Sequence, residues 1–164
     1  MNNNTNKLAS ILNTKSHPID APKYRSKCKS MLDRDGVLVL KNFLLKNSIQ
    51  SILEEAKQQE RLAYYCVNEH NVYLDPNDNN YPKSHPRNRT VISSKGCITD
   101  DQVPKDSALR ALYDSEDFKE FLCSVLNEES LYKYDDNLSS INIHFAKTGQ
   151  ELGWHFDNSS FAIT

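Results

Sequence analysis

Several features that would assign this chain to a large class of proteins are missing from its sequence. No hydrophobic run approaches the ~20 residues that a helix needs to cross a bilayer, and the Asn-rich start lacks the basic and then apolar layout of a signal peptide. Excess positive charge is missing too, because 20 basic residues stand against 22 acidic ones, whereas nucleic-acid-binding surfaces need a surplus of Lys and Arg. The sequence therefore predicts a cytoplasmic protein with no membrane and no nucleic acid among its partners.

Cysteine and glycine are also scarce. The 4 cysteines lie far apart in the chain, with no Cys-x-x-Cys pair and no cluster with His, so neither a zinc knuckle nor a disulfide framework is indicated. With only 4 glycines, the chain has no Gly-rich loop for a phosphate group. A hydrophobic share of 38% and a charged share of 26% are those of an ordinary globular domain. We interpret the cysteines as buried free thiols.

The spacing of apolar residues predicts an α+β chain. Residues 1–20 are polar and predict a flexible leader, and residues 21–164 predict the N-terminal portion of a single domain. A β-branched run at 37–40 predicts a short buried strand, and the stretch 67–104, rich in Pro, Asn and Asp, predicts a long loop. Apolar residues at helical spacing predict helices at 22–35, 47–61, 107–113 and 115–127.

The last third of the sequence changes to the period of a strand. Apolar and polar residues alternate over 141–146 and again over 154–157, and a turn at 148–149 predicts that these two strands form a hairpin. Residues 161–164 predict the start of another strand. Because so small a sheet has unpaired edges and buries little surface, the pattern predicts the first part of a longer β-sandwich or barrel, incomplete at its C-terminus.

The segment with the most chemical information is Gly-Trp-His-Phe-Asp at residues 153–157. Residues two apart on a strand point to the same face, so His155 and Asp157 would aim an imidazole and a carboxylate at one point, while Trp154 packs on the opposite side. One His nitrogen and one carboxylate oxygen are two of the three ligands in the facial triad that holds Fe(II). The alternative is a polar pair on the surface of an amphipathic strand, because His-x-Asp is a common spacing by chance.

Residues 139–144 and 149–164, which include this motif, resemble the core of the Fe(II)/2-oxoglutarate-dependent oxygenases. The resemblance is strongest to the subgroup of free-amino-acid radical halogenases and their hydroxylase relatives. Upstream, the dipeptide Tyr81-Pro82, the tripeptide at 85–87 and the segment 109–113 are similar to the same family.

The resemblance implies a double-stranded β-helix, of the jelly-roll or cupin-like kind, with flanking helices. It also implies Fe(II), 2-oxoglutarate and O2 as cofactor and co-substrates, and a small, amino-acid-like substrate. In the family, a distal His completes the metal site beside the residues that match His155 and Asp157, and an Arg beyond that His binds 2-oxoglutarate. None of the 5 His follows Asp157, so we expect a fragment of an oxygenase that is inactive by itself.

The remaining site residues follow from the same resemblance. Halogenases carry a small residue where Asp157 stands, so a carboxylate here favours hydroxylation of an unactivated C–H bond over halogenation. Asn142 and His144 share one face of the predicted strand at 141–146 and are candidates for cofactor binding, with a polar outer strand face as the alternative. Arg87 and Arg89 are candidates for binding a substrate carboxylate, which suits a bidentate guanidinium, with a solvated basic stretch as the alternative.

Two other functions are compatible with the sequence. One is a catalytically dead remnant that persists as a folded binding or interaction module. The other is a zinc or manganese site built from His155, Asp157 and His144.

Overall fold

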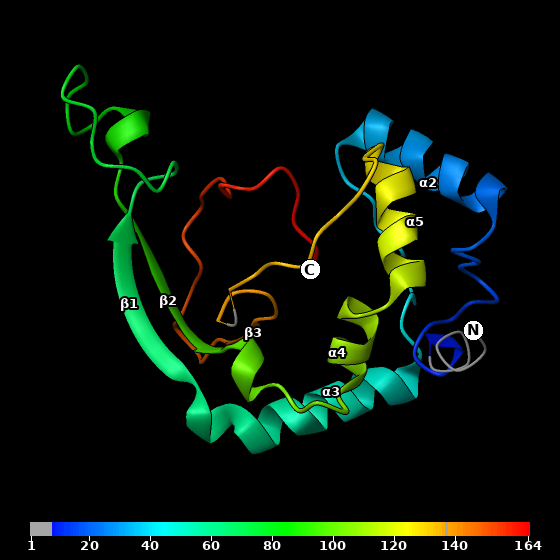
Figure 1. The fold of residues 1–164 in the computed structure, drawn as a ribbon. Helices are drawn as coiled ribbons and strands as arrows, with labels where there is room; N and C mark the ends of the chain where they lie inside the picture. Colours follow the sequence, from blue (N-terminus) through cyan, green and yellow to red (C-terminus); the bar gives the residue numbers. More distant parts are fainter. Residues whose placement is uncertain (1–7, 137) are drawn as a thin grey trace. The chain divides into compact units, whose positions relative to one another are not determined.

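The computed structural model describes residues 8–136 and 138–164, so the first seven residues of the predicted leader lie outside the described residues. The described chain forms two compact units. The first unit holds the described residues up to Gln59 together with Thr99–Asn142, and the second holds Glu60–Ile98 together with Ile143–Thr164. Helices dominate the first unit and strands the second (Figure 1), which confirms the predicted α+β class.

The first unit contains the predicted helices, and local capping signals set their ends. Its elements are α2 (Pro22–Asp35), α3 (Lys46–Gln59), the 3-10 turn η3 (Asp100–Gln102), α4 (Ala108–Tyr113) and α5 (Glu116–Leu126). Pro22 opens α2, and Gly36 closes it in the left-handed conformation at φ 68°. The Ser115 hydroxyl accepts a hydrogen bond from the Phe118 amide and so caps α5. Among the described helices, none has the length and apolar composition needed to cross a membrane.

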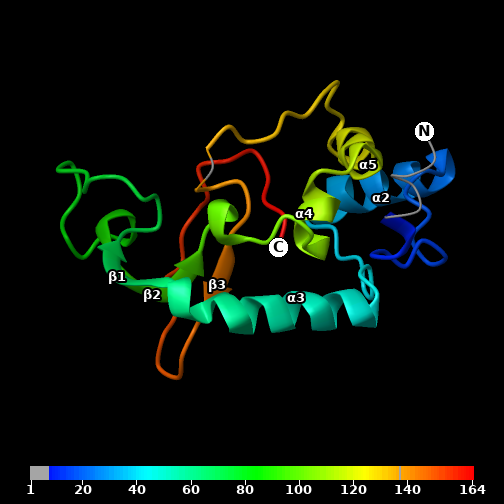
Figure 2. The same cartoon turned by 60° about the horizontal axis from the view of Figure 1, so that its bottom comes forward.

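The core of the first unit lies between α2, α5 and the segment that precedes α2. α2 and α5 lie side by side in both views of the ribbon (Figures 1 and 2). The Phe121 ring is fully buried and stacks on Tyr24. The buried hydrophobic residues of this core are Leu8, Ile11, Leu12, Ile19, Cys28, Phe118, Phe121 and Val125.

Residues 8–20 correct the prediction of a flexible leader, because they pack into this core. Leu8, Ile11 and Leu12 are buried at helical spacing. The backbone bonds from Asn13 N–H to the Phe43 carbonyl and from Leu45 N–H to the Ile11 carbonyl, each 2.9 Å, hold the segment against the chain before α3. The polar composition of the first 20 residues concealed this short apolar stripe.

The prediction of a short buried strand at 37–40 in the first unit was wrong. Residues 37–40 form no strand, and Val39 is 62% exposed while Leu38 and Leu40 pack against the core. A short apolar run becomes a strand only where another strand offers hydrogen bonds, and the described residues offer none here. The predicted helix at 47–61 is present as α3, in which Ala56 is buried while Ile49 and Leu53 are exposed.

The second unit is built on an antiparallel sheet with the order β1-β2-β3. β1 (Tyr64–His70) pairs with β2 (Val91–Ile98) over its full length, and β2 pairs with β3 (Ile143–Phe145). Two 3-10 turns, η1 (Glu60–Leu62) and η2 (Pro86–Asn88), complete the regular structure. The predicted loop over residues 67–104 was wrong, because most of β1 and all of β2 fall inside it.

The connection between β1 and β2 is held together by two buried asparagines. The Asn71 amide donates to the Asp75 carbonyl at 2.8 Å, and its oxygen accepts from the Tyr73 amide at 2.9 Å. Asn88 makes the corresponding pair of bonds with the backbone of Asp78, both 2.8 Å. Because an Asn side chain both donates and accepts, it can replace the backbone partners that an irregular segment lacks.

The predicted hairpin between residues 141–146 and 154–157 is also wrong, because β3 pairs with β2 and residues 154–157 form no strand. Beyond β3, the chain turns at Lys147–Gln150, where the Gln150 amide donates to the Lys147 carbonyl at 2.9 Å. It then returns to β2, where the Ser94 amide donates to the Glu151 carbonyl at 2.7 Å. The segment has no regular strand, and none forms at 161–164. Trp154, predicted to pack in a core, is 86% exposed.

Candidate functional site

The candidate site lies on the segment 153–157 in the second unit, and Gly153 determines how closely that segment approaches β2. A Cβ atom at Gly153 would lie 2.7 Å from the Ile92 carbonyl oxygen and 2.8 Å from a Val91 methyl carbon. The Gly153 amide donates to the Ser93 hydroxyl at 2.9 Å. Farther along, the Phe156 amide donates to the Val72 carbonyl at 2.7 Å. Close approach and these two bonds fix the backbone on both sides of His155.

His155 has its ring orientation set by its own backbone. Its Nδ1 lies 2.7 Å from the Gly153 carbonyl oxygen. Because a carbonyl oxygen can only accept, the proton of the neutral ring is on Nδ1 and the lone pair is on Nε2. Nε2 lies 3.4 Å from Oδ1 of Asp157. The predicted convergence of the imidazole and the carboxylate is therefore confirmed.

This pair has the donor chemistry of a metal site. Two ligand atoms at right angles around one ion, with bonds of about 2.1 Å, are about 3 Å apart. The 3.4 Å between His155 Nε2 and Asp157 Oδ1 is close to that separation. Imidazole and carboxylate together suit divalent iron, manganese or zinc. Within residues 8–136 and 138–164, however, no group of three His, Cys, Asp or Glu side chains could enclose an ion, so the chain as described offers two protein ligands.

His144 lies opposite Cys97 in the sheet and has another partner. Its Nε2 is 3.2 Å from the Lys95 ammonium, which donates to it. Partial burial lowers the pKa of His144, and the neighbouring Lys95 charge lowers it further. An ammonium at this position also repels a metal cation, which weighs against the three-residue zinc or manganese site.

Asn142 lies just before β3, at the end of the first unit. Its exposed side-chain amide donates to the Ser139 carbonyl at 3.0 Å. It therefore lies outside the strand whose alternation suggested that Asn142 and His144 share a face.

The two candidate arginines differ in their surroundings. Arg87 places its guanidinium carbon 4.6 Å from the centre of the Tyr73 ring, and the Tyr73 ring lies 5.5 Å from that of Phe156. Arg87 is thus linked through two aromatic rings to the residue between His155 and Asp157. Its Nη1 is buried and makes no hydrogen bond to any described residue. Arg89 is exposed and uses its backbone amide to close η2.

Sequence reasoning missed His70, which contacts the candidate site directly. The His70 and His155 rings meet edge to face, with their centres 5.4 Å apart. His70 is the last residue of β1, a strand hidden in the stretch that predicted a loop. The two tyrosines and the β-branched Val67 of Tyr64–His70 were the signal that could have revealed it.

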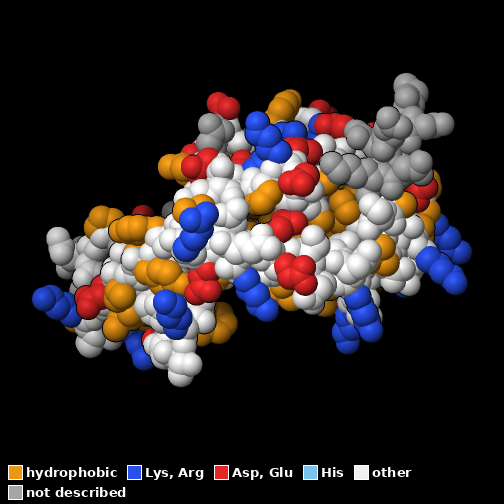
Figure 3. All heavy atoms as spheres, turned by 90° about the horizontal axis from the view of Figure 1, so that it is seen from below, with side chains coloured by type: hydrophobic (Ala, Val, Ile, Leu, Met, Phe, Trp, Pro, Cys, Tyr) orange, Lys and Arg blue, Asp and Glu red, His pale blue; other side chains and the backbone are white. Residues whose placement is uncertain are grey.

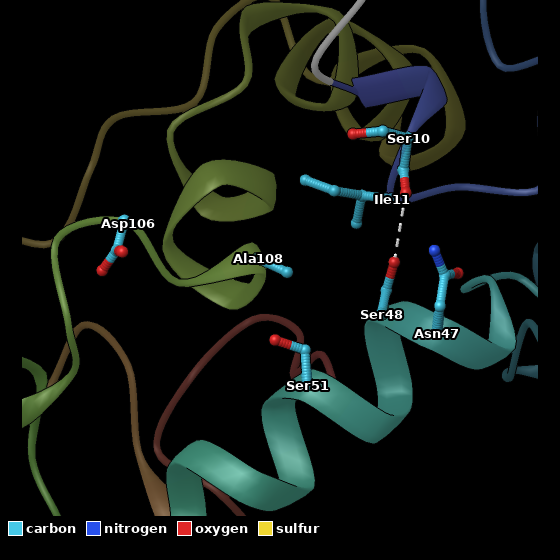
Figure 4. A pocket seen from close by; sticks show the side chains of 7 residues that line it. All are labelled: Ser10, Ile11, Asn47, Ser48, Ser51, Asp106 and Ala108. Atoms are coloured by element: carbon cyan, nitrogen blue, oxygen red, sulfur yellow. Dashed lines mark hydrogen bonds between the residues drawn. The ribbon is translucent and has the colours of Figure 1, made fainter.

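A separate hollow in the first unit contains none of the predicted site residues. It lies at the start of α3 (Figure 4), where the Ser48 hydroxyl donates to the Ser10 carbonyl at 3.3 Å. Apart from Ile11, the side chains around it are small or polar, and Asp106 is the charged one among Ser10, Ile11, Asn47, Ser48, Ser51, Asp106 and Ala108. On the face in Figure 3, the basic side chains of the described residues stand among acidic ones and do not gather in one patch.

Comparisons with protein-family models, with curated protein sequences and with solved structures found no match to this chain. The grounds for a function are therefore the motif and the geometry of its residues.

Proposed function

We propose that this chain is part of an Fe(II)/2-oxoglutarate-dependent oxygenase that hydroxylates an amino-acid-like small molecule. The observation that carries the proposal is the pair formed by His155 and Asp157, whose Nε2 and Oδ1 are 3.4 Å apart while Nδ1 is engaged by the Gly153 carbonyl. The three-stranded sheet would be the first part of a double-stranded β-helix.

His155 and Asp157 would hold the iron, and their orientation would be set before it binds. Bound Fe(II) with 2-oxoglutarate supplies the activation of O2 that an unactivated C–H bond requires. The Nδ1–H bond of His155 keeps the Nε2 lone pair directed at the ion. The carboxylate of Asp157 adds a negative charge that disfavours a halide at the same centre, which is why we propose hydroxylation.

Arg87 would bind the carboxylate of the substrate. A guanidinium forms two parallel hydrogen bonds with a carboxylate, and the Nη1 of Arg87 has no hydrogen-bond partner among the described residues. Its stacking on Tyr73, which in turn contacts Phe156, connects this charge to the candidate metal pair. Arg89 would stay in solvent.

Anaerobic titration with Fe(II) and 2-oxoglutarate tests the metal site. We expect the visible charge-transfer absorption of the iron–2-oxoglutarate chelate to appear with the wild-type chain. It should be lost in His155→Ala and in Asp157→Ala but kept in Asp135→Ala, which removes an exposed carboxylate elsewhere. Absorption that is equally strong in the His155 variant would overturn the proposal.

A binding or interaction module is the second candidate, and the exposed aromatic side chains favour it. Trp154 is 86% exposed and Phe156 63% exposed, an arrangement typical of surfaces that a partner covers. This function predicts no rise in melting temperature with Fe(II), because a ligand raises it only by binding the native state. It also predicts that His155→Ala leaves the melting temperature unchanged.

A further inference from the structure

A continuous series of hydrogen bonds leads from His155 to β1. His155 Nδ1 contacts the Gly153 carbonyl at 2.7 Å, and the Gly153 amide contacts the Ser93 hydroxyl at 2.9 Å. The same hydroxyl lies 2.6 Å from His70 Nε2. His70 Nδ1 lies 2.9 Å from the Asn71 carbonyl. The series joins side chains from two strands to the motif at 153–157.

The two carbonyl oxygens that accept from the histidine rings, those of Gly153 and Asn71, determine the direction of every hydrogen bond in the series. Carbonyl oxygens only accept, so both His155 and His70 carry their proton on Nδ1. The Nε2 of neutral His70 must then accept, and the Ser93 hydroxyl must donate to it. Because that hydroxyl gives its proton to His70, its oxygen is the acceptor for the Gly153 amide. All donors and acceptors in the series are matched.

We propose that His70 and Ser93 are positioning residues for His155: they hold the Gly153 backbone so that the His155 ring keeps its proton on Nδ1 and its lone pair on Nε2. The inference rests on the proposed function, in which His155 is a metal ligand. Residues that orient a ligating His are as much a part of a metal site as the ligand itself.

Two further contacts support this role. The edge-to-face packing of His70 on His155, at 5.4 Å between ring centres, limits rotation of the His155 ring. Gly153 lies so close to β2 that even a Cβ atom would meet the Ile92 carbonyl at 2.7 Å. A small shift of β2 or β1 would therefore be transmitted to the carbonyl that His155 uses.

Ser94 provides a matched control on the same strand. Its hydroxyl accepts from the Glu151 amide at 3.2 Å, so Ser93 and Ser94 each bind one backbone amide of the same segment. Of the two, Ser93 is the one that also bonds to His70. A comparison of the two serines separates a general anchoring effect from the effect of His70.

The first readout is the tautomer of His155 in the metal-free protein, measured by nitrogen-15 NMR of the imidazole. We expect the Nδ1–H form in the wild type and a mixture of the two tautomers in Ser93→Ala and His70→Phe. Ser93→Thr and His70→Gln should restore the wild-type form, because Thr keeps the hydroxyl and the Gln oxygen can accept from Ser93. Ser94→Ala should keep the wild-type form.

The second readout is the affinity for Fe(II), measured anaerobically. We expect Ser93→Ala and His70→Phe to weaken binding by about 10–100-fold, as is usual for partners of a ligating residue, with recovery in the two conservative variants. An unchanged His155 tautomer in Ser93→Ala and His70→Phe, or an equal loss in Ser94→Ala, overturns the inference. If the tautomer responds as expected while His155→Ala leaves Fe(II) binding intact, the positioning role stands and the proposed metal function fails.

Discussion

Replacement of Gly153 by Ala should detach the segment 151–157 from β2. The new Cβ would lie 2.7 Å from the Ile92 carbonyl oxygen and 2.8 Å from a Val91 methyl. The oxygen belongs to the backbone of a paired strand, so it cannot move aside without breaking the sheet. Overpacking of this kind costs about 1–3 kcal/mol.

Two effects limit the size of the loss. Ala lowers the conformational entropy of the unfolded chain, which stabilises the folded state by about 0.4–1 kcal/mol. The clash can also be relieved by release of the segment, which gives up the bonds of Gly153, Phe156 and Ser94 to their partners at about 1 kcal/mol each. We therefore expect a net destabilisation of the attached segment by about 1–2 kcal/mol, which is a factor of about 5–30 in its opening equilibrium.

Amide hydrogen exchange measures this opening directly. The amides of Ser94 and Phe156 donate across the junction, so their protection should fall by that factor in Gly153→Ala. Gly149→Ala is the control, because its Cβ would meet no atom of residues 8–136 or 138–164 within 4 Å, although the φ of Gly149 is +85°. It should cost about 1 kcal/mol through the left-handed backbone and leave both amides protected. Unchanged protection of Ser94 and Phe156 in Gly153→Ala would refute the reasoning from close approach.

Three further changes test other parts of the structure. Phe121→Ala removes a fully buried ring and should lower the free energy of unfolding by about 3–5 kcal/mol. Trp154→Ala, at a side chain that is 86% exposed, should change this free energy by less than about 0.5 kcal/mol. Urea denaturation compares the two variants, and equal losses would contradict the assignment of the core. Partial burial and the charge of Lys95 lower the pKa of His144, so its contribution to stability is complete above about pH 6.5 and is lost as the pH falls toward the lowered pKa. His144→Gln should therefore make the free energy of unfolding less dependent on pH in that window. An unaltered pH profile of this free energy would count against the prediction. Burial raises the pKa of the Cys28 thiol, so a thiol reagent at neutral pH should modify Cys28 only when the chain unfolds. Labelling of Cys28 in the native protein would contradict its burial.

The amino-acid sequence by itself determined the helices of the first unit. Pro22 and Gly36 mark the ends of α2, and Ser115 begins α5. These signals could be read without the structure because helix caps and helical spacing act over a few neighbouring residues. The free state of the 4 cysteines also agrees with the prediction, although only Cys28 is buried.

Tertiary structure decided the strands. β1 and β2 are separated by a long polar connection, and a strand forms only where a distant partner supplies hydrogen bonds. The same reason explains why residues 37–40, with a strand-like composition, form none. It also explains why Trp154 is exposed, since the segment that carries it forms no strand and no hairpin that would bury one of its faces.

In the candidate site, too, one part followed from the sequence and another part only from the tertiary structure. The spacing of His155 and Asp157 placed an imidazole and a carboxylate within 3.4 Å, because two side chains separated by one residue in an extended chain point the same way. The contact of His70 with His155 and the approach of Gly153 to β2 could not be read from the sequence. They join residues far apart in the chain, and only the pairing of β1 with β2 and the return of the chain after β3 bring those residues together.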